Sequence, residues 1–288
     1  MTSSRIIPKL GWLLFILIAA AAAVSFFAVR AAALEDNLLR VYFLDVGQGD
    51  AIFVQAPNGN QVLIDGGPDT LVARQLSKIM PFYDHSIDLV VLSHPHADHI
   101  NGLLEVLRRY DVSQVLENYY PYDTPEYAEW NKLKTEAQIS QAQAGQVIDL
   151  GAGVRIFVIY PDQINAGQSK NNPNDASVVL KLVYGENSLL LSGDIEAPLE
   201  KKLVLIGADL DSDFLKIAHH GSKTSTTQEF LEAVTPKAAF IEVGAKNRYG
   251  HPHPKVLERL ESLNIKYYRT DIDGTIELLL DGRNYLIK

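Results

Sequence analysis

The sequence predicts a layered α/β domain over residues 38–288, preceded by an apolar segment within residues 1–33. Short runs rich in Val, Ile, Leu, Phe and Tyr alternate with stretches of helical spacing, which is typical of strands interleaved with helices. The chain has 288 residues, of which 47% are hydrophobic and 21% are charged. This composition supports a large core, and it excludes both a disordered chain and a protein with many membrane spans.

The apolar segment has the length and composition of a membrane anchor. Residues 10–29 carry no charge and follow Arg5 and Lys9, and about 20 helical residues suffice to cross a bilayer. We therefore expect a single span with the α/β domain outside the cytoplasm. Ala31 and Ala33 form a small-x-small pattern, so a cleaved signal peptide with a secreted product stays open as the alternative.

The charge balance and the absence of cysteine narrow the range of functions. The 26 basic and 35 acidic side chains give a net charge of −9. An acidic chain is not a general binder of polyanions, so any contact with nucleic acid has to be local. Because the sequence contains no cysteine, it has no disulfide framework, thiol nucleophile or cysteine-ligated zinc site.

The individual elements follow from hydrophobic periodicity and turn residues. Predicted strands are, in order, 39–44, 51–55, 61–64, 88–92, 154–160, 177–183, 188–191, 214–218, 238–243, 266–269, 275–280 and 284–287. Predicted helices are 71–80, 102–110, 125–143, 197–206, 227–234 and 254–263. The first two strands are joined by a glycine-rich turn, residues 45–50, whose backbone amides could face a phosphate.

A cluster of metal-ligand residues follows the predicted buried strand 88–92. It contains His94, His96, Asp98 and His99 within six residues. In an extended segment His94 and His96 point to the same side, while Asp98 and His99 fall at the turn into the next helix. The pattern offers two nitrogens to one metal ion and a carboxylate with an imidazole to a neighbouring ion. Solvated histidines in a polar loop are the ordinary alternative.

Three other predicted strands also end in residues of ligand type. Asp65, Asp194 and the pair His219 and His220 each follow such a strand. Asp194 could bridge two ions, and the pair could supply a further imidazole. Each residue by itself has an ordinary explanation as a turn or capping residue. Ligand residues at four strand ends of one chain indicate a dinuclear site.

These motifs resemble those of the metallo-β-lactamase fold, and more closely those of the metal-binding domain of ComEC-type DNA-uptake (competence) proteins. The resemblance is carried by residues 44–50, 64–67, 92–99, 174–180, 192–194, 218–222 and 249–254. It implies a four-layer αββα sandwich with two divalent ions, zinc or manganese, where the two sheets meet. ComEC-type proteins also carry a multi-pass channel region, and a single predicted span takes its place here. We therefore expect a separate channel protein as a partner.

The resemblance also implies a role for each motif. The implied ligands are His94 and His96 for one ion, Asp98, His99 and one of His219 and His220 for the other, and Asp194 between them. His219 is preferred within the pair because it follows its strand directly. Asp65 would lie behind the ligands and orient one of the histidines.

The sequence departs from the general metallo-β-lactamase pattern at one place. Most hydrolases of this fold contribute a further histidine between the first cluster and the bridging aspartate. No histidine occurs between His99 and His219 in this chain. Asn174 and Asp175 are therefore candidates to replace that nitrogen with an oxygen, and more oxygen ligands shift the preference from zinc towards manganese.

Other residues near the motifs could serve catalysis and substrate binding. Asp98 could orient a water and take its proton, and His220, His251 or His253 could protonate a leaving group. His253 has a second explanation, because it could cap the predicted helix that begins at Pro254.

Two further groups could contact the substrate, although both have ordinary explanations. Lys223, Lys246 and Arg248 lie near the motifs and could contact phosphate, or they could be solvated surface residues. An aromatic cluster could stack on exposed bases or pack in the core; its members are Tyr119, Tyr120, Tyr122, Tyr127 and Trp130.

We expect a membrane-anchored, metal-dependent phosphodiesterase, with DNA as its substrate. One alternative is a hydrolase of small phosphodiesters or phosphorylcholine-type esters. A second is a non-catalytic accessory subunit of DNA uptake. Hydrolysis of β-lactams is less favoured, because the motifs match the competence subgroup.

Overall fold

The computed structural model describes residues 12, 15–17, 37–162 and 172–288. The chain divides into two compact units, Met1–Leu38 and Leu39–Lys288, and the fold described below is that of the second. The membrane span expected over residues 10–29 falls mostly outside the described residues. Within the described residues, no helix is long and apolar enough to cross a bilayer.

The first sheet combines an antiparallel half with a parallel half. Its order among the described residues is β15-β14-β1-β2-β3-β4-β5-β6. Neighbours from β15 to β3 are antiparallel, and neighbours from β3 to β6 are parallel. Parallel neighbours need crossover connections, which α2, α3 and α4 supply. The bounds are β1 Leu39–Phe43, β2 Ile52–Gln55, β3 Gln61–Ile64, α2 Leu71–Ile79, β4 Ser86–Leu92, α3 Ala97–Arg109, β5 Asp111–Glu117, α4 Pro125–Leu133, β6 Gln138–Gln141, β14 Ile276–Leu280 and β15 Tyr285–Ile287.

The second sheet is built in the same way. Its order among the described residues is β13-β12-β11-β10-β9-β8-β7. Neighbours from β7 to β10 are antiparallel, and neighbours from β10 to β13 are parallel, with α5, α6 and α7 between them. The bounds are β7 Val147–Gly151, β8 Val154–Tyr160, β9 Val179–Tyr184, β10 Asn187–Leu191, α5 Ala197–Leu205, β11 Phe214–Lys216, α6 Gln228–Val234, β12 Ala238–Ile241, α7 Pro254–Ser262, β13 Lys266–Arg269 and α8 Thr270–Asp273.

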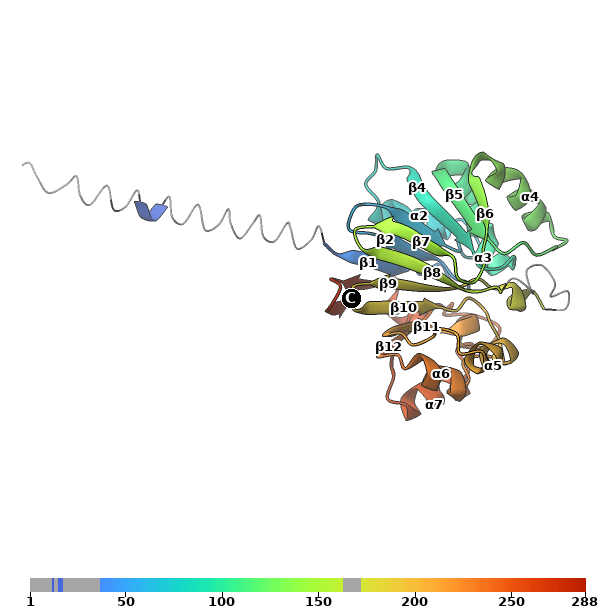
Figure 1. The fold of residues 1–288 in the computed structure, drawn as a ribbon. Helices are drawn as coiled ribbons and strands as arrows, with labels where there is room; N and C mark the ends of the chain where they lie inside the picture. Colours follow the sequence, from blue (N-terminus) through green and yellow to red (C-terminus); the bar gives the residue numbers. More distant parts are fainter. Residues whose placement is uncertain (1–11, 13–14, 18–36, 163–171) are drawn as a thin grey trace, which may run out of the picture. The chain divides into compact units, whose positions relative to one another are not determined.

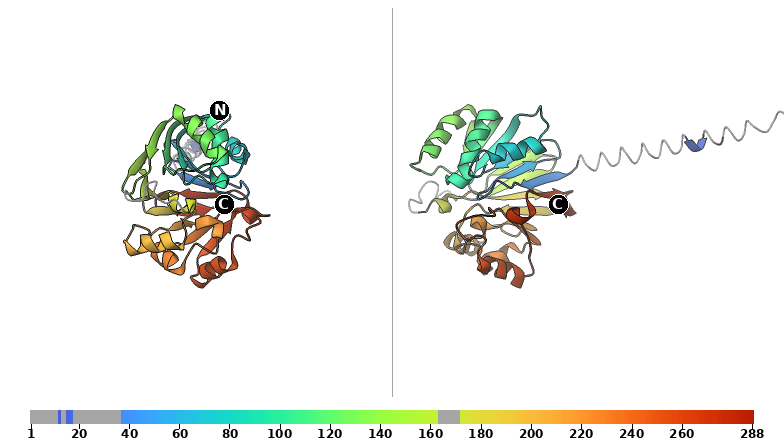
Figure 2. Two further views of the ribbon diagram at one scale, coloured as in Figure 1. Left: turned by 90° about the vertical axis from the view of Figure 1, so that its right-hand side faces the viewer. Right: turned by 180° about the vertical axis from the view of Figure 1, so that it is seen from behind.

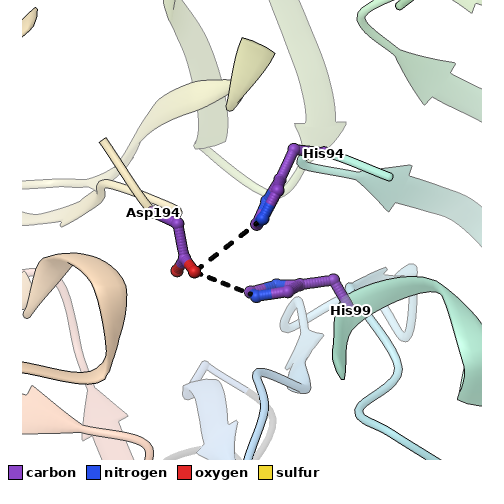
Figure 3. Close-up of side chains that lie close together, drawn as sticks. All are labelled: His94, His99 and Asp194. Carbon is purple, nitrogen blue, oxygen red and sulfur yellow. Dashed lines mark ion pairs between the residues drawn. The ribbon is translucent and has the colours of Figure 1, made fainter. Parts of the chain in front are cut away.

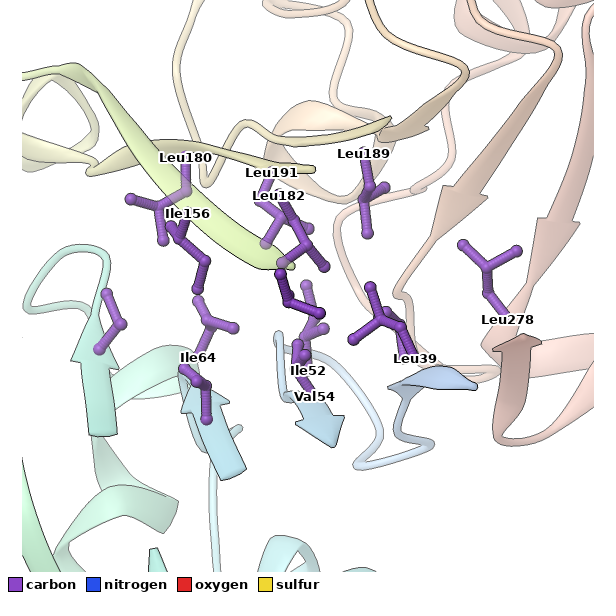
Figure 4. Packing of buried hydrophobic residues seen from close by; sticks show 14 of the residues in the cluster. Leu39, Ile52, Val54, Ile64, Ile156, Leu180, Leu182, Leu189, Leu191 and Leu278 are labelled. Carbon is purple, nitrogen blue, oxygen red and sulfur yellow. The ribbon is translucent and has the colours of Figure 1, made fainter. Parts of the chain in front are cut away.

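Three buried clusters hold these layers together. Between the sheets, side chains such as Ile52, Ile64, Leu180 and Leu191 pack against one another (Figure 4). A second cluster lies between the second sheet and α5, α6 and α7, and a third lies between the first sheet and α2, α3 and α4. The two groups of helices cover the outer faces (Figures 1 and 2). The predicted α/β architecture, helices outside two facing sheets, is confirmed.

The sequence prediction differs most from the structure between residues 111 and 151; it also begins α3 at Gly102 instead of Ala97 and omits α8. It expects one helix over residues 125–143, but α4 ends at Leu133 and the chain continues into β6. It also misses β5 and β7. β6 is an edge strand with a largely exposed pattern, and β5 is buried only over its last three residues. Strands without a continuous buried face lack the apolar periodicity by which strands are recognised.

The candidate site residues follow the carboxyl ends of the parallel strands in both sheets. Asp65 follows β3, His94 and its neighbours follow β4, Asp194 follows β10, His219 and His220 follow β11, and Glu242 follows β12. Parallel strands of one sheet present their carboxyl ends at the same edge, which is where ligands bind in open α/β sheets. The sequence motifs are therefore brought together although they lie far apart along the chain.

Candidate metal centre

The candidate site converges on one carboxylate oxygen, Asp194 Oδ2. The distances to this oxygen are 3.3 Å from His99 Nε2 and 3.5 Å from His220 Nε2. They are 3.8 Å from His94 Nε2 and 3.9 Å from His219 Nε2. Figure 3 shows His94 and His99 both pointing at Asp194. Asp194 is almost fully buried, so four imidazoles surround a carboxylate that water barely reaches.

The first cluster lies at the junction of β4 and α3. His94 and His96 stand on the extended segment before the helix, with His94 Nε2 3.0 Å from His96 Nδ1. Asp98 and His99 occupy the first turn of α3, and His99 Nε2 lies 3.9 Å from Asp98 Oδ1. The two halves of the motif therefore present ligands from a strand end and from a helix, as the sequence predicts.

A close glycine contact fixes the position of that helix. A Cβ added to Gly102 of α3 would lie 1.8 Å from the carbonyl oxygen of Gly66, so only glycine permits this approach. The contact holds α3 against the turn that follows β3. Asp65 in that turn then reaches His99 Nδ1 at 2.8 Å and accepts hydrogen bonds from the backbone N and the hydroxyl of Ser93. Asp65 thus lies behind a ligand histidine.

Each histidine around Asp194 has a partner at its other ring nitrogen. The Nδ1 partners are Ser93 Oγ for His94 at 3.0 Å, Asp65 Oδ2 for His99 at 2.8 Å, Glu196 Oε1 for His219 at 3.4 Å, and the Glu242 carbonyl for His220 at 2.9 Å. A partner at Nδ1 sets the orientation of the ring, and a carboxylate or carbonyl there keeps Nε2 available for a metal. All four Nε2 atoms face Asp194.

His219 and His220 reach the site through an unusual backbone. Both adopt left-handed conformations, with φ of 52° and 53°, which few residues other than glycine adopt and which occur most often at functional sites. The sequence prefers His219 for the second ion, whereas in the structure it is His220 that lies beside Asp98 and His99. His220 Nε2 lies 3.4 Å from Asp98 Oδ2, and Asp98, His99 and His220 form one compact group of ligand atoms. Two successive left-handed residues turn both rings inward, which strand position alone does not reveal.

The residues present fit two metal ions that share Asp194. Asp98, His99, His220 and Asp194 could hold one ion. His94, His96, His219 and Asp194 could hold the other, so that His219 replaces the histidine missing from the general family pattern. Within the described residues, the buried atoms His99 Nε2, His220 Nε2 and Asp194 Oδ1 have no hydrogen-bond partner. Buried polar atoms are rarely left unpaired, and a cation is the partner that suits these nitrogen and oxygen atoms.

The electrostatics of the site match a place for cations. Burial alone would lower the pKa of His220, but Asp194 and Asp50 raise it to about 10. Burial likewise opposes the charge of His99, but Asp194 and Asp65 raise its pKa well above the usual range. By contrast, burial and the neighbouring His99 hold the pKa of His94 well below its usual value. The nearby carboxylates therefore favour the protonated forms of His99 and His220, which shows that positive charge is stabilised at this place.

A buried ion pair behind the ligands is the feature that sequence reasoning missed. Lys216, the last residue of β11, is fully buried and forms a salt bridge with Asp50 of the β1–β2 turn. Lys216 Nζ also lies 3.8 Å from Asp194 Oδ1, and Asp50 Oδ1 lies 3.1 Å from His220 Nδ1. Glu242 accepts a hydrogen bond from the backbone N of Ala51 at 2.9 Å. The sequence does contain a signal for this ion pair, because Lys216 is a charged residue within an otherwise apolar run, residues 214–218.

The remaining candidates separate into those near the site and those away from it. His251 lines the same pocket as the ligands, and burial together with His220 and His219 lowers its pKa to about 4. His253 instead caps α7, where its Nδ1 accepts from the Lys255 backbone at 3.2 Å. The capping explanation therefore describes His253, because its ring is engaged at the helix start.

Of the two candidates Asn174 and Asp175, only Asn174 lies beside a proposed metal ligand. The Asn174 side chain lies 3.5 Å from His219 Nδ1 and donates to Glu196 at 3.3 Å, so it stands behind His219. The Asp175 carbonyl accepts from the hydroxyl of Tyr160, and Asp175 does not line the pocket. Glu196 was not singled out from the sequence.

The predicted substrate-binding groups also divide. Lys223, Lys246 and Arg248 are exposed and do not line the pocket. In the aromatic cluster, Tyr122 lines the pocket and Tyr119 is exposed, whereas the other members, Tyr120, Tyr127 and Trp130, are buried.

We predict that His219 and His220 serve different ions. His219→Ala and His220→Ala should each remove one of the two ions, because each deletes one imidazole facing Asp194. Metal content after loading with Zn²⁺ or Mn²⁺ and desalting, measured by mass spectrometry of the metal, tests this. Asp98 and His220 belong to the same ion, so the double variant Asp98→Ala with His220→Ala should bind as much metal as His220→Ala alone. The double variant Asp98→Ala with His219→Ala should lose both ions. His253→Ala is the matched control and should retain both; equal loss of both ions from either single variant contradicts the assignment.

We also predict that the interaction between Lys216 and Asp50 stabilises the fold. Lys216→Met should lower the free energy of unfolding by about 3–5 kcal/mol, because it takes the lysine away from the buried carboxylates of Asp50 and Asp194. The double variant Asp50→Asn with Lys216→Met should recover part of that loss. Denaturant unfolding of the metal-free chain measures both changes. The single variant Asp50→Asn completes the comparison. If the double variant loses as much free energy of unfolding as Lys216→Met and Asp50→Asn added together, the two side chains do not interact.

Comparison with known proteins agrees with this geometry. A sequence profile of the Metallo-beta-lactamase superfamily matches residues 44–244. "ComE operon protein 3" of Bacillus subtilis (strain 168) is 31% identical over 262 residues, covering 84% of this chain and 33% of that protein. "Competence protein ComA" of Neisseria gonorrhoeae is 30% identical over 257 residues, covering 88% of this chain and 34% of that protein. The chain thus spans about a third of the length of these curated relatives.

A solved structure shows the same fold. Tm1679, a metal-dependent hydrolase of the beta-lactamase superfamily, superposes with a TM-score of 0.52 at 14% identity, covering 83% of this chain and 98% of that one. The profile match extends over more than half of this chain, and the competence proteins confirm the ComEC-type resemblance of the motifs. This chain therefore belongs to the metallo-β-lactamase superfamily of metal-dependent hydrolases.

Proposed function

We propose that this chain is a two-metal phosphodiesterase that cleaves DNA. The observation that carries the proposal is that four imidazoles face Asp194 Oδ2 beside a pocket of about 340 Å³, whose lining includes His96, Asp98, Asp194, His219 and His220. Two ions held about 3.5–4 Å apart are the arrangement that clamps both oxygens of an in-line displacement at phosphorus. The names of the curated relatives, which are competence proteins, support a nucleic-acid substrate.

Asp98 is the residue best placed to act as the base. Its side chain is 31% exposed at the pocket, whereas the other carboxylates near Asp194 are buried. Burial would raise the pKa of Asp98, but His99 and His220 hold it below its usual value, so the carboxylate is ionised. When bound, the two ions would acidify a water and draw charge from the phosphate oxygens. Asp98 would orient that water and accept its proton.

His251 is the residue best placed to meet the leaving group. Its ring lines the pocket, and its Nδ1 has no hydrogen-bond partner among the described residues. With a pKa of about 4, the ring is neutral at pH 7 and carries one N–H. It would donate a hydrogen bond to the departing oxygen. His220, the other candidate acid, is buried against Asp98 and Asp194 and serves as a ligand.

The size of the pocket also favours a second candidate function. A volume of about 340 Å³ is within the range of small-molecule sites, so a small phosphodiester could be the substrate. The length of chain that is required for turnover distinguishes the two candidates.

The nuclease proposal predicts metal-dependent cleavage of DNA. The full chain in mild detergent, stripped of metal and supplied with Mn²⁺, Zn²⁺ or Mg²⁺, should cut labelled DNA, and removal of the metal should abolish cleavage. The variant Asp98→Ala with His99→Ala should lose activity by at least a hundredfold, because it removes the base and two ligands. Turnover of bis-p-nitrophenyl phosphate without cleavage of DNA would favour the small-ester alternative. Metal binding without either activity would favour an accessory subunit.

We propose further that residues 10–29 anchor the chain in the cell membrane, with the hydrolase unit outside the cytoplasm and a separate DNA-uptake channel as its partner. The uncharged stretch supports the anchor. The full chain should stay with membranes after an alkaline carbonate wash. A variant with Ala19→Arg and Ala20→Arg should be released, because charges at the centre of a span cost several kcal/mol. A soluble, shortened product in the medium would show that the segment is a cleaved signal.

A further inference from the structure

Two tyrosines flank the metal ligands in the pocket. Besides the ligands His96, Asp98, Asp194, His219 and His220, the pocket is lined by Gln48, Ala97, Tyr122, Tyr249 and His251. Tyr122 lies beside the first ligand cluster, with its ring centroid 5.9 Å from that of His96. Tyr249 lies with its ring centroid 5.7 Å from that of His251, and the His251 centroid is in turn 5.7 Å from that of the ligand His219. The pocket therefore has one tyrosine ring beside the ligand His96 and another beside His251.

Tyr249 is held in place by polar contacts rather than by packing in the core. Its side chain is 56% exposed, and its backbone N donates to Asn247 Oδ1 at 3.2 Å. The same Asn247 oxygen accepts from the His251 backbone at 2.9 Å. The Tyr249 and His251 rings are inclined by 26°, so they lie nearly parallel. An exposed ring held in this way contributes little to a core and is free to contact a ligand.

Arg248 adds positive charge beside this ring. Its guanidinium carbon lies 5.3 Å from the centre of the Tyr249 ring, and it donates to the Tyr249 hydroxyl at 3.3 Å. Aromatic rings combined with nearby arginine are the usual means by which proteins bind single-stranded nucleic acid, with bases stacked on the rings and the cation near the backbone. Because the chain is acidic overall, such contacts have to be local.

We propose that Tyr249 and Tyr122 stack the two nucleobases that flank the scissile phosphate, so that the site takes an unpaired strand. The proposal rests on the nuclease function proposed above and deepens it. Bases in a duplex are stacked on both faces within the helix and cannot lie on a protein ring without unpairing. An unpaired base has a free face. Stacking of this kind tolerates any sequence, because every base offers a π face.

A pair of substrates isolates the contribution of the bases. Both are single-stranded DNA oligomers with one cleavable phosphodiester between methylphosphonate linkages. In one, the two flanking nucleosides carry bases, and in the other they are abasic. The full chain should cleave the first about tenfold faster or more, since each stacked base contributes on that order. The same sequence within a duplex should be cleaved more slowly than the single strand.

Variants show whether Tyr249 is responsible. Tyr249→Ala should lose about tenfold in kcat/KM on the strand with bases and nothing on the abasic strand, whereas Tyr249→Phe should behave as the unchanged chain. Tyr119→Ala is the matched control, because the exposed fraction of Tyr119, 53%, is close to that of Tyr249 but Tyr119 does not line the pocket. Equal losses on both strands, or no loss on either, would overturn the proposal.

A binding measurement keeps the two proposals separable. In the background of Asp98→Ala with His99→Ala, fluorescence anisotropy gives the Kd of each strand without cleavage. Tighter binding of the strand with bases, lost on Tyr249→Ala, supports stacking even where the unchanged chain fails to cut DNA. Identical Kd values for the two strands overturn stacking even where DNA is cut.

Discussion

The site depends on one constraint, which is that four imidazole nitrogens face a single buried carboxylate oxygen of Asp194. Such a cluster cannot be solvated, because Asp194, His94, His99 and His220 are almost fully buried. Its atoms therefore need positive charge among them. Protons on His99 and His220 supply part of that charge in the metal-free chain, and metal ions would supply it more fully. The turns that hold the ligands, including Gly66 against Gly102, are arranged around this requirement.

Behind the ligands lies a second layer of buried ionisable side chains, in which Lys216 and Asp50 form an ion pair, whereas burial and Asp50 raise the pKa of Glu242 well above its usual value. Lys216, Asp50 and Glu242 join β11, the β1–β2 turn and β12, and so connect the two sheets directly beneath the site. Burying isolated charges in this way costs several kcal/mol per ion unless each finds a partner. The position of Lys216 near both Asp50 and Asp194 provides those partners. Metal binding and fold stability are therefore linked through shared residues, so a substitution that weakens one is expected to weaken the other.

The open side of the site has a different character from the buried side. Carboxylates and a lysine lie behind the ligands, whereas Tyr122, Tyr249, His251 and the exposed part of Asp98 face the pocket. This face therefore combines the flat rings of the tyrosines and the neutral ring of His251 with one ionised carboxylate, that of Asp98. The basic side chains Lys223, Lys246 and Arg248 stand outside the pocket wall, where they could attract a polyanion without neutralising the ligand carboxylates.

The motif residues could be read from the sequence because ligand chemistry requires particular residue types at particular spacings. His94, His96, Asp98 and His99 and the aspartates Asp65 and Asp194 stand out in this way, and the interleaved strands and helices predict the α/β layers. The sequence could not show β6, because an edge strand exposed to water needs no apolar period. It could not show the function of Asp50, Lys216 or Glu196 either, because their roles arise from neighbours far away along the chain.

The choice between His219 and His220 shows most clearly where prediction stops. The sequence by itself determined that an imidazole pair follows β11, since composition and strand pattern are local properties. Only the tertiary structure decided that His220 joins Asp98 and His99 while His219 turns towards Asp194 with Glu196 behind it. That decision depends on two left-handed backbone conformations, which local propensity disfavours. In this conformation the His219 backbone N donates to the Gly193 carbonyl, and His220 Nδ1 lies 2.9 Å from the Glu242 carbonyl.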